Sequence, residues 1–185
     1  MNITWQGNTT FTLANNQKKI TIDPQGKENT DTHIYTKEQG HEDTLKDFDW
    51  PGEYEVGGIG WTSIPYQKED GSNEMMYVFD LDYIKVCHLG NLDTDLDEKQ
   101  LEAIGDIDIL IIPLGENKTL SVKKGVSLIE KIEPRIVIPM LFNESSLSEF
   151  KKEFSIATSE ELPSLNIKKS ALPLEETQFI FLKQS

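Results

Sequence analysis

The sequence predicts an α/β protein in which layered β-sheets are covered by helices. The first half of the chain alternates short β-like runs with turns, and the second half alternates apolar strands with helical patterns. The chain has 185 residues and neither a low-complexity tract nor a clear linker. These observations favour one domain spanning residues 1–185, long enough to bury a sizeable core without covalent staples.

The first half reads as a series of strands separated by turn residues. Asn15-Asn16 makes a turn between two of them, and Asp23-Pro24 ends the opening meander because proline cannot extend a strand. Residues 25–48 are mostly polar and form the best loop candidate. The predicted strands of this half cover residues 2–5, 9–13, 19–22, 33–35, 53–56, 60–65, 75–80 and 83–88.

The second half has the pattern of strands connected by helices. Its predicted helices cover residues 95–104, 121–132 and 145–154. Asp95 or Asp97 is expected to cap the first of these helices, and Ser145 or Ser146 the last. The predicted strands of this half cover residues 108–113, 135–139, 165–168 and 177–182.

The charge balance excludes several classes of function. With 32 acidic and 18 basic residues the formal net charge is −14, which disfavours nucleic acids and anionic membranes as partners. Arg135 is the only arginine, so bidentate phosphate recognition is scarce. No apolar run approaches the roughly 20 residues that span a bilayer, and the N-terminal residues lack the pattern of a signal peptide. We therefore expect a cytoplasmic protein.

Cysteine and histidine are scarce in this chain. Cys87 is the only cysteine, which excludes an intrachain disulfide and a cysteine-rich zinc site. The only histidines are His33, His41 and His88. Cys87 and His88 are neighbours on a predicted strand and should point to opposite faces, so we expect a packed histidine rather than an activated thiol.

Several short strings, taken in order, resemble the metallo-β-lactamase superfamily. The strings are Ile22-Asp23-Pro24, Pro51-Gly52-Glu53-Tyr54-Glu55-Val56, Val86-Cys87-His88-Leu89-Gly90, Gln100-Leu101-Glu102-Ala103-Ile104-Gly105 and Ile132-Glu133-Pro134-Arg135-Ile136-Val137-Ile138-Pro139-Met140. The chain is most similar to the predicted zinc-dependent hydrolases related to ascorbate-phosphate lactonases, from Met1 to about Leu182. This resemblance implies an αβ/βα four-layer sandwich, with two facing sheets and outer helices.

The resemblance also implies a metal site, and this sequence departs from it. The family carries a His-x-His-x-Asp-His loop with a later histidine, an aspartate and a final histidine, which together bind zinc or manganese. The positions of this chain that match the family's metal-site residues are Asn8, Lys37, Gln39, His41, Glu42, Lys68, Asn91 and Leu141. Amine, amide and leucine side chains at most of these positions are poor ligands for such metals.

These departures lead to the expectation of a catalytically silent protein that has lost its metal site and uses no cofactor. Lys37 and Lys68 would supply cations in place of the metal, and Asp23 and Asp43 would be cleft residues. Asp23 is expected to orient the neighbouring loop through hydrogen bonds. The expected function is the binding of an unknown small molecule or the interaction with another protein.

Two alternatives stay open. One is a metal-dependent hydrolase, of lactonase or phosphodiesterase type, with a rebuilt site around His41, Glu42, Asp43 and Asp23 that uses zinc or manganese. The other is a subunit of a homo- or hetero-oligomer, because lactonase-like relatives commonly assemble.

Overall fold

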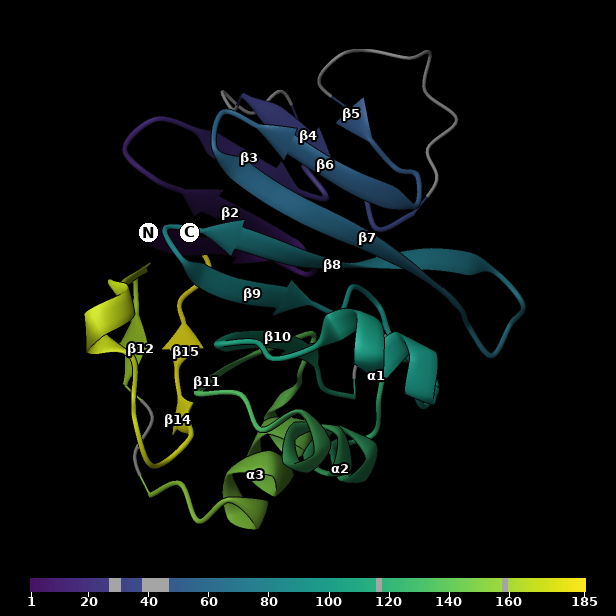
Figure 1. Cartoon of the computed structure of the whole chain (residues 1–185). Coiled ribbons are helices and arrows are strands. Elements are labelled where there is room, and N and C mark those ends of the chain that lie inside the picture. Colours follow the sequence, from purple (N-terminus) through teal and green to yellow (C-terminus); the bar gives the residue numbers. More distant parts are fainter. Residues whose placement is uncertain (27–30, 38–46, 116–117, 158–159) are drawn as a thin grey trace.

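The computed structural model describes residues 1–26, 31–37, 47–115, 118–157 and 160–185, and two facing β-sheets form its centre (Figure 1). The six-stranded sheet has the order β13 (Leu165–Asn166), β1 (Asn2–Gly7), β2 (Thr10–Ala14), β3 (Lys19–Ile22), β4 (Thr32–Ile34) and β5 (Asp47–Phe48). The seven-stranded sheet has the order β14 (Gln178–Phe179), β11 (Ile136–Met140), β10 (Ile109–Pro113), β9 (Ile84–His88), β8 (Asn73–Leu81), β7 (Ile59–Gln67) and β6 (Gly52–Val56). A small parallel pair joins β12 (Glu161–Leu162) to β15 (Phe181–Leu182).

The main core fills the space between the two sheets. Alternate residues of each strand point inward, as the pleat of a β-strand requires. Phe11 of the six-stranded sheet and Tyr77 and Phe79 of the seven-stranded sheet are fully buried in this core. The two-residue alternation of apolar side chains in the sequence therefore determines which face of each sheet is buried.

Three helices cover the outer face of the seven-stranded sheet (Figure 1). They are α1 (Glu98–Ile104), α2 (Val122–Ile132) and α3 (Glu144–Glu153), and a short 3₁₀ helix, η1 (Lys169–Ala171), follows later in the chain. Cys87, Leu110 and Val137 of the sheet belong to the second hydrophobic cluster, which the helices complete with Leu128 and Phe150. Among the described residues, none of these three helices lies on the six-stranded sheet.

The predicted α/β sandwich is confirmed, and the element boundaries differ by a few residues. Helix α1 begins after Asp97, one of the two expected caps, whose side chain accepts a hydrogen bond from the Gln100 amide. Helix α3 is capped by Asn143 rather than by a serine, and Ser146 completes the capping box. In the described part of the chain, no helix combines the length and apolar character needed to cross a membrane.

The parallel strands β9, β10 and β11 end on the same side of the seven-stranded sheet, so the chain segments that follow them lie together there. Strands β10 and β11 are buried along both faces, as expected for parallel strands between a sheet and helices, and β9 is buried except at Lys85. The chain leaves β9 through Gly90, which has a left-handed φ of 59°, and leaves β11 through Leu141, with a φ of 50°. Asn91 and Leu141 thus follow the carboxyl ends of β9 and β11, two strands of one sheet that are separated by β10.

Candidate functional site

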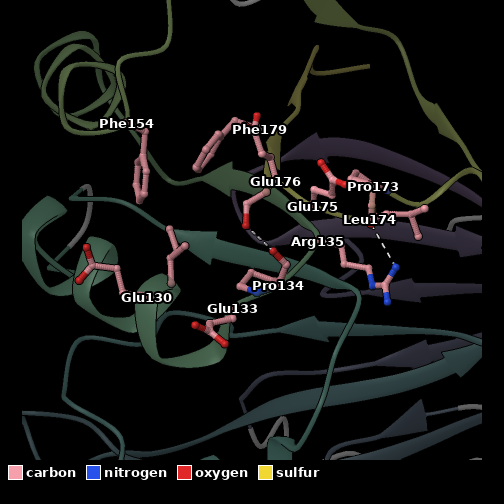
Figure 2. A pocket seen from close by; sticks show the side chains of 12 residues that line it. Glu130, Glu133, Pro134, Arg135, Phe154, Pro173, Leu174, Glu175, Glu176 and Phe179 are labelled. Atoms are coloured by element: carbon pink, nitrogen blue, oxygen red, sulfur yellow. Dashed lines mark hydrogen bonds between the residues drawn. The ribbon is translucent and has the colours of Figure 1, made fainter.

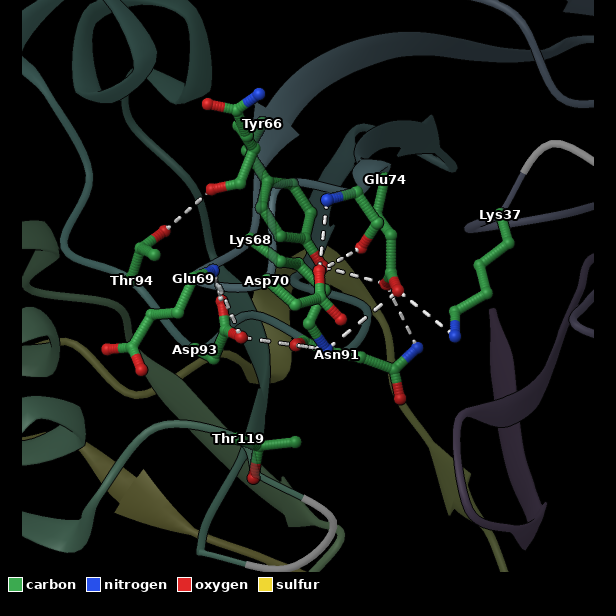
Figure 3. A network of polar contacts seen from close by, with 12 residues as sticks. Lys37, Tyr66, Lys68, Glu69, Asp70, Glu74, Asn91, Asp93, Thr94 and Thr119 are labelled. Carbon is green, nitrogen blue, oxygen red and sulfur yellow. Dashed lines mark hydrogen bonds and ion pairs between the residues drawn. The ribbon is translucent and has the colours of Figure 1, made fainter.

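Three segments that are distant in sequence meet beside the carboxyl end of β9: the chain after β4, the β7–β8 hairpin and the chain after β9. Lys37 follows β4 and forms an isolated antiparallel bridge with Glu74 at the start of β8. Lys68 follows β7, and Asn91 follows β9. Gly90 permits this approach, because a Cβ atom there would lie 2.9 Å from the Met75 carbonyl oxygen. Figure 3 shows the side chains of Lys37, Lys68 and Asn91 directed toward Glu74.

Glu74 is the centre of this polar cluster and is only 1% exposed. Its Oε2 atom accepts hydrogen bonds from the Tyr66 hydroxyl at 3.1 Å and the Asn91 amide nitrogen at 3.2 Å. Its Oε1 atom has no hydrogen bond but lies 3.2 Å from Lys37 Nζ and 3.8 Å from Lys68 Nζ. Two ammonium groups therefore balance a buried carboxylate, which would otherwise be very unfavourable.

Lys68 links the cluster to the loop after β9. Its side chain is 9% exposed, and Nζ donates a hydrogen bond to the Asn91 carbonyl oxygen at 3.0 Å. The same nitrogen lies 3.8 Å from Asp93, whose carboxylate accepts from the Glu69 backbone amide at 3.4 Å. Lys68 thus holds two buried carboxylates and one carbonyl in a fixed arrangement.

Tyr66 acts in the cluster as a neutral donor. Burial raises the pKa of its hydroxyl strongly, and the nearby negative charge of Glu74 raises it further. The phenol therefore stays protonated at any physiological pH, and its hydroxyl donates a hydrogen bond to Glu74. The negative charge in this part of the cluster belongs to Glu74 rather than to the ring.

Asp23 fixes the chain immediately before Lys37. Its carboxylate accepts hydrogen bonds of 2.7 Å from both the backbone amide and the hydroxyl of Thr36. Burial raises the pKa of Asp23, although the hydrogen bonds from Thr36 oppose this shift and the charge of Glu74 adds to it. The contact with Thr36 agrees with the expectation that Asp23 orients the adjacent loop.

The structure brings together three of the residues singled out in the sequence and separates two others. Lys37, Lys68 and Asn91 surround Glu74, whereas Leu141 is buried in the core between the sheets. Asn8 lies in an exposed turn with a φ of 48°, where its carbonyl oxygen accepts from the Trp5 indole. Gln39, His41, Glu42 and Asp43 lie outside the described residues.

Sequence reasoning did not find Glu74, Tyr66 or Asp93. Glu74 stands at the border between a polar hairpin and an apolar strand, where a solvent-facing glutamate is common. Its burial depends on Lys37 and Asn91, which no local pattern connects to it. Strand alternation could have indicated only that Glu74 shares a face with Met76, which is fully buried.

The resemblance stated above implies a zinc or manganese ion, and the described residues do not by themselves fit such an ion. Across the ranges that the structure describes, no three histidine, cysteine or carboxylate side chains lie close enough together to hold a metal ion. Glu74 already faces two ammonium groups, and its other neighbours are an amide and a phenol. This donor set differs from the imidazole and thiolate ligands that zinc prefers.

Comparison with known proteins identifies the relatives of this chain. A family model described as "Beta-lactamase superfamily domain" matches residues 2–141. A UPF0173 metal-dependent hydrolase of Thermococcus onnurineus is 32% identical over 113 residues, which cover 55% of this chain and 50% of the relative. A UPF0173 protein of Pyrococcus furiosus is 39% identical over 72 residues, covering 37% of this chain and 33% of the relative. The chain thus matches half or less of the length of these two curated relatives.

A solved structure with nearly complete coverage supports the same fold. It is a Thermotoga maritima protein provisionally described as a zinc-dependent hydrolase of the metallo-β-lactamase superfamily. It matches with a TM-score of 0.80 and 26% identity over 98% of both chains. A metallo-β-lactamase fold protein of Bacillus subtilis, at 7% identity and a TM-score of 0.67 over 98% of this chain and 95% of its own, shows the fold alone.

These comparisons correct two expectations drawn from the sequence. The expectations of a catalytically silent protein with a lost metal site and of no cofactor are wrong, because several relatives are named metal-dependent hydrolases and so imply a metal. That expectation rested on the ligand types at the positions that match the family's metal site, of which the loop after β4 supplies several. Three of the loop positions used, Gln39, His41 and Glu42, lie outside the described residues.

Proposed function

This chain belongs to the metallo-β-lactamase superfamily, and from that premise we propose that it is a metal-dependent hydrolase with a rebuilt, non-standard site. The names of the UPF0173 relatives support the metal requirement, and one structural observation supports the location of the site. Lys37, Lys68 and Asn91, which match metal-ligand positions of the family, converge on the buried Glu74 at the carboxyl edge of the seven-stranded sheet. The names of the UPF0173 relatives supply the reaction class, and lactones or phosphodiesters are the proposed substrates.

The described residues suit the binding of a substrate that gains negative charge during hydrolysis. Attack on an ester, lactone or phosphodiester places charge on an oxygen, and a fixed cation nearby stabilises that charge. We assign this contact to Lys37, whose side chain is 60% exposed although its amine lies beside Glu74. Lys68, Tyr66 and Asn91 are positioning residues, because they hold Glu74 and so the amine of Lys37.

The metal requirement is tested directly by elemental analysis. Protein purified without chelator is expected to contain near-stoichiometric zinc or manganese, because its relatives are named metal-dependent. A chelator should abolish hydrolysis of lactone and phosphodiester substrates, and adding the metal back should restore it. Background metal content together with no turnover of any of these substrates would contradict the proposal.

Substitution of Lys37 tests the assigned site. Lys37→Ala removes a transition-state contact and should lower kcat/KM about a hundredfold, the effect of losing one electrostatic contact of this kind. Lys99→Ala, at an exposed position of α1, is the matched control and should leave kcat/KM unchanged. Equal activity of the two variants would show that Lys37 has no role in hydrolysis. If Lys37→Ala lost its metal, the loss of activity would be due to the missing ion rather than to a missing substrate contact.

A further inference from the structure

A concave surface lies at the end of the seven-stranded sheet opposite to Glu74, where the parallel strands β11 and β14 begin. It has a volume of about 730 Å³ and lies where α2 ends and where β11 and β14 begin (Figure 2). We call it the acidic groove and define it by Ile129, Glu130, Glu133, Phe154, Glu176 and Phe179. Its volume falls within the range of roughly 300 to 1,000 Å³ that is typical of ligand-binding clefts.

The groove is strongly electronegative. Glu130, Glu133, Glu175 and Glu176 all line it, and none of them forms an ion pair with another residue that the structure describes. The only arginine, Arg135, also lines the groove, so the four glutamates face one guanidinium there. It donates to the Pro173 carbonyl oxygen at 3.1 Å, and its Nε atom lies 3.6 Å from Asp108.

Helix α2 adds to the negative potential. Glu130 lies in its last turn and Glu133 at its C-cap, next to carbonyl groups that already carry partial negative charge. A helix C-terminus normally favours cations, and Lys131 is the only basic residue of this last turn. The two exposed carboxylates at this end outnumber Lys131, so a cation from outside the chain would lower the remaining negative potential.

The floor and rim of the groove are apolar. The rings of Phe154 and Phe179 lie 4.5 Å apart between centroids, and both are only partly buried. Leu174 on the rim is 89% exposed, which is unusual for a large aliphatic side chain. The occupant that matches this surface therefore carries both a positive charge and an apolar side chain.

The backbone beside the groove favours an extended occupant. Strand β14 is the last strand of the seven-stranded sheet in the described part of the chain. The amides of Gln178 and Ile180 donate to Arg135 and Val137 of the β11 side, so the intervening backbone groups of Phe179 face away from β11. An extended peptide can pair with such a strand edge while its side chains enter the groove.

We propose that the acidic groove binds an extended peptide segment of a partner protein in which lysine or arginine residues alternate with large apolar residues. A second copy of this chain is a poor match, because each copy carries a net charge of −14. The groove and Glu74 lie at opposite ends of the strands of the seven-stranded sheet. This inference therefore goes beyond the proposed hydrolase and does not depend on it.

The test uses a short fluorescein-labelled peptide of alternating lysine and leucine, with binding measured by fluorescence anisotropy. The double variant Glu133→Gln/Glu176→Gln should weaken binding about fivefold, the effect of removing two exposed ion pairs. The matched control is Glu98→Gln/Glu102→Gln on α1, which changes the net charge equally and should retain the affinity. Leu174→Ser should also weaken binding, since it removes the exposed apolar contact.

Charge reversal separates a specific site from general attraction to an acidic protein. Glu133→Lys/Glu176→Lys should lose the lysine–leucine peptide and gain binding of the corresponding glutamate–leucine peptide. All substituted side chains are exposed, so the fold should persist, and circular dichroism spectra should confirm it. The proposal is overturned if the wild-type chain does not bind the lysine–leucine peptide, or if the groove and α1 double variants lose the same affinity.

Discussion

His88 is a buried histidine whose neutral form is fully hydrogen-bonded. Its Nε2 atom lies 3.0 Å from the Thr9 carbonyl oxygen, and its Nδ1 atom accepts from the Gly90 amide at 3.1 Å. The ring therefore carries its proton on Nε2. Cys87 points to the other face of β9, into the cluster covered by helices, and burial raises the pKa of its thiol. The sequence-based view of this pair as packed strand residues agrees with this geometry.

We predict that the protein becomes less stable at acidic pH because of the buried, neutral His88. Burial lowers the pKa of His88 from 6.5 to about 4, so between these values the unfolded chain binds a proton that the folded chain does not. The free energy of unfolding should therefore decrease as the pH falls through this window, by about 3 kcal/mol in total. Urea unfolding of the wild type and of His88→Gln measures the effect; parallel pH profiles of the two proteins would contradict it.

Glu74 is predicted to be a stabilising charge because its removal takes from the buried Lys68 one of its two carboxylate neighbours and leaves Asp93 as the other. Glu74→Gln should lower the free energy of unfolding by about 3 kcal/mol, as is typical when one side of a buried ion pair is removed. Glu53→Gln, on an exposed position of β6, is the control and should change it by less than about 0.5 kcal/mol. Equal urea midpoints for the two variants would show that Glu74 contributes no net stability.

At the scale of elements, helix positions follow from the sequence more closely than helix ends do. The apolar spacing in residues 122–132 identifies α2 within one residue of its expected start, because one face of this helix packs on the sheet. The cap of α3 lies two or three residues before the expected Ser145 or Ser146. Asparagine and serine have similar capping propensity, and only the turn of the chain after β11 selects Asn143.

The C-terminal end of α2 yields a prediction about stability. Glu133 adopts a left-handed conformation with φ 51° and ψ 49°, where a side chain is strained and glycine is preferred. Glu133→Gly should therefore raise the free energy of unfolding by about 1 kcal/mol. Glu130→Gly, inside the last helical turn, should lower it by a similar amount. Thermal unfolding measures both, and a destabilising Glu133→Gly would show that the carboxylate contributes more than its backbone costs.

At the scale of the whole molecule, the net charge of −14 predicts a response to salt. Unpaired carboxylates repel one another in the folded state, and this repulsion weakens as the ionic strength rises. The melting temperature should rise by a few degrees between about 0.01 and 0.5 M salt, where the Debye length shortens several-fold. Sodium chloride and potassium chloride should act equally, because screening depends on ionic strength. A lower melting temperature in salt would mean that favourable ion pairs dominate.

The sandwich was predictable from the sequence, but its strand neighbours were not. Period-two alternation and the resemblance indicate two sheets, yet β1 pairs with β13 through Asn2 and Asn166, which no local pattern connects. In the site, by contrast, Lys68 and Asn91 could be identified, because they follow sequence strings that resemble those of the family. Glu74 could not be identified in this way, because its role depends on burial by distant segments.

Gly90 limits which positions of the site can change in evolution. Any side chain at this position would collide with the Met75 carbonyl oxygen and the side chain of Thr36, so the backbone path there tolerates no replacement. The next residue, Asn91, carries its functional group on a side chain that other residue types could replace without moving that path. Mutational drift can therefore exchange the reactive groups of this site one at a time while the scaffold that presents them is inherited unchanged.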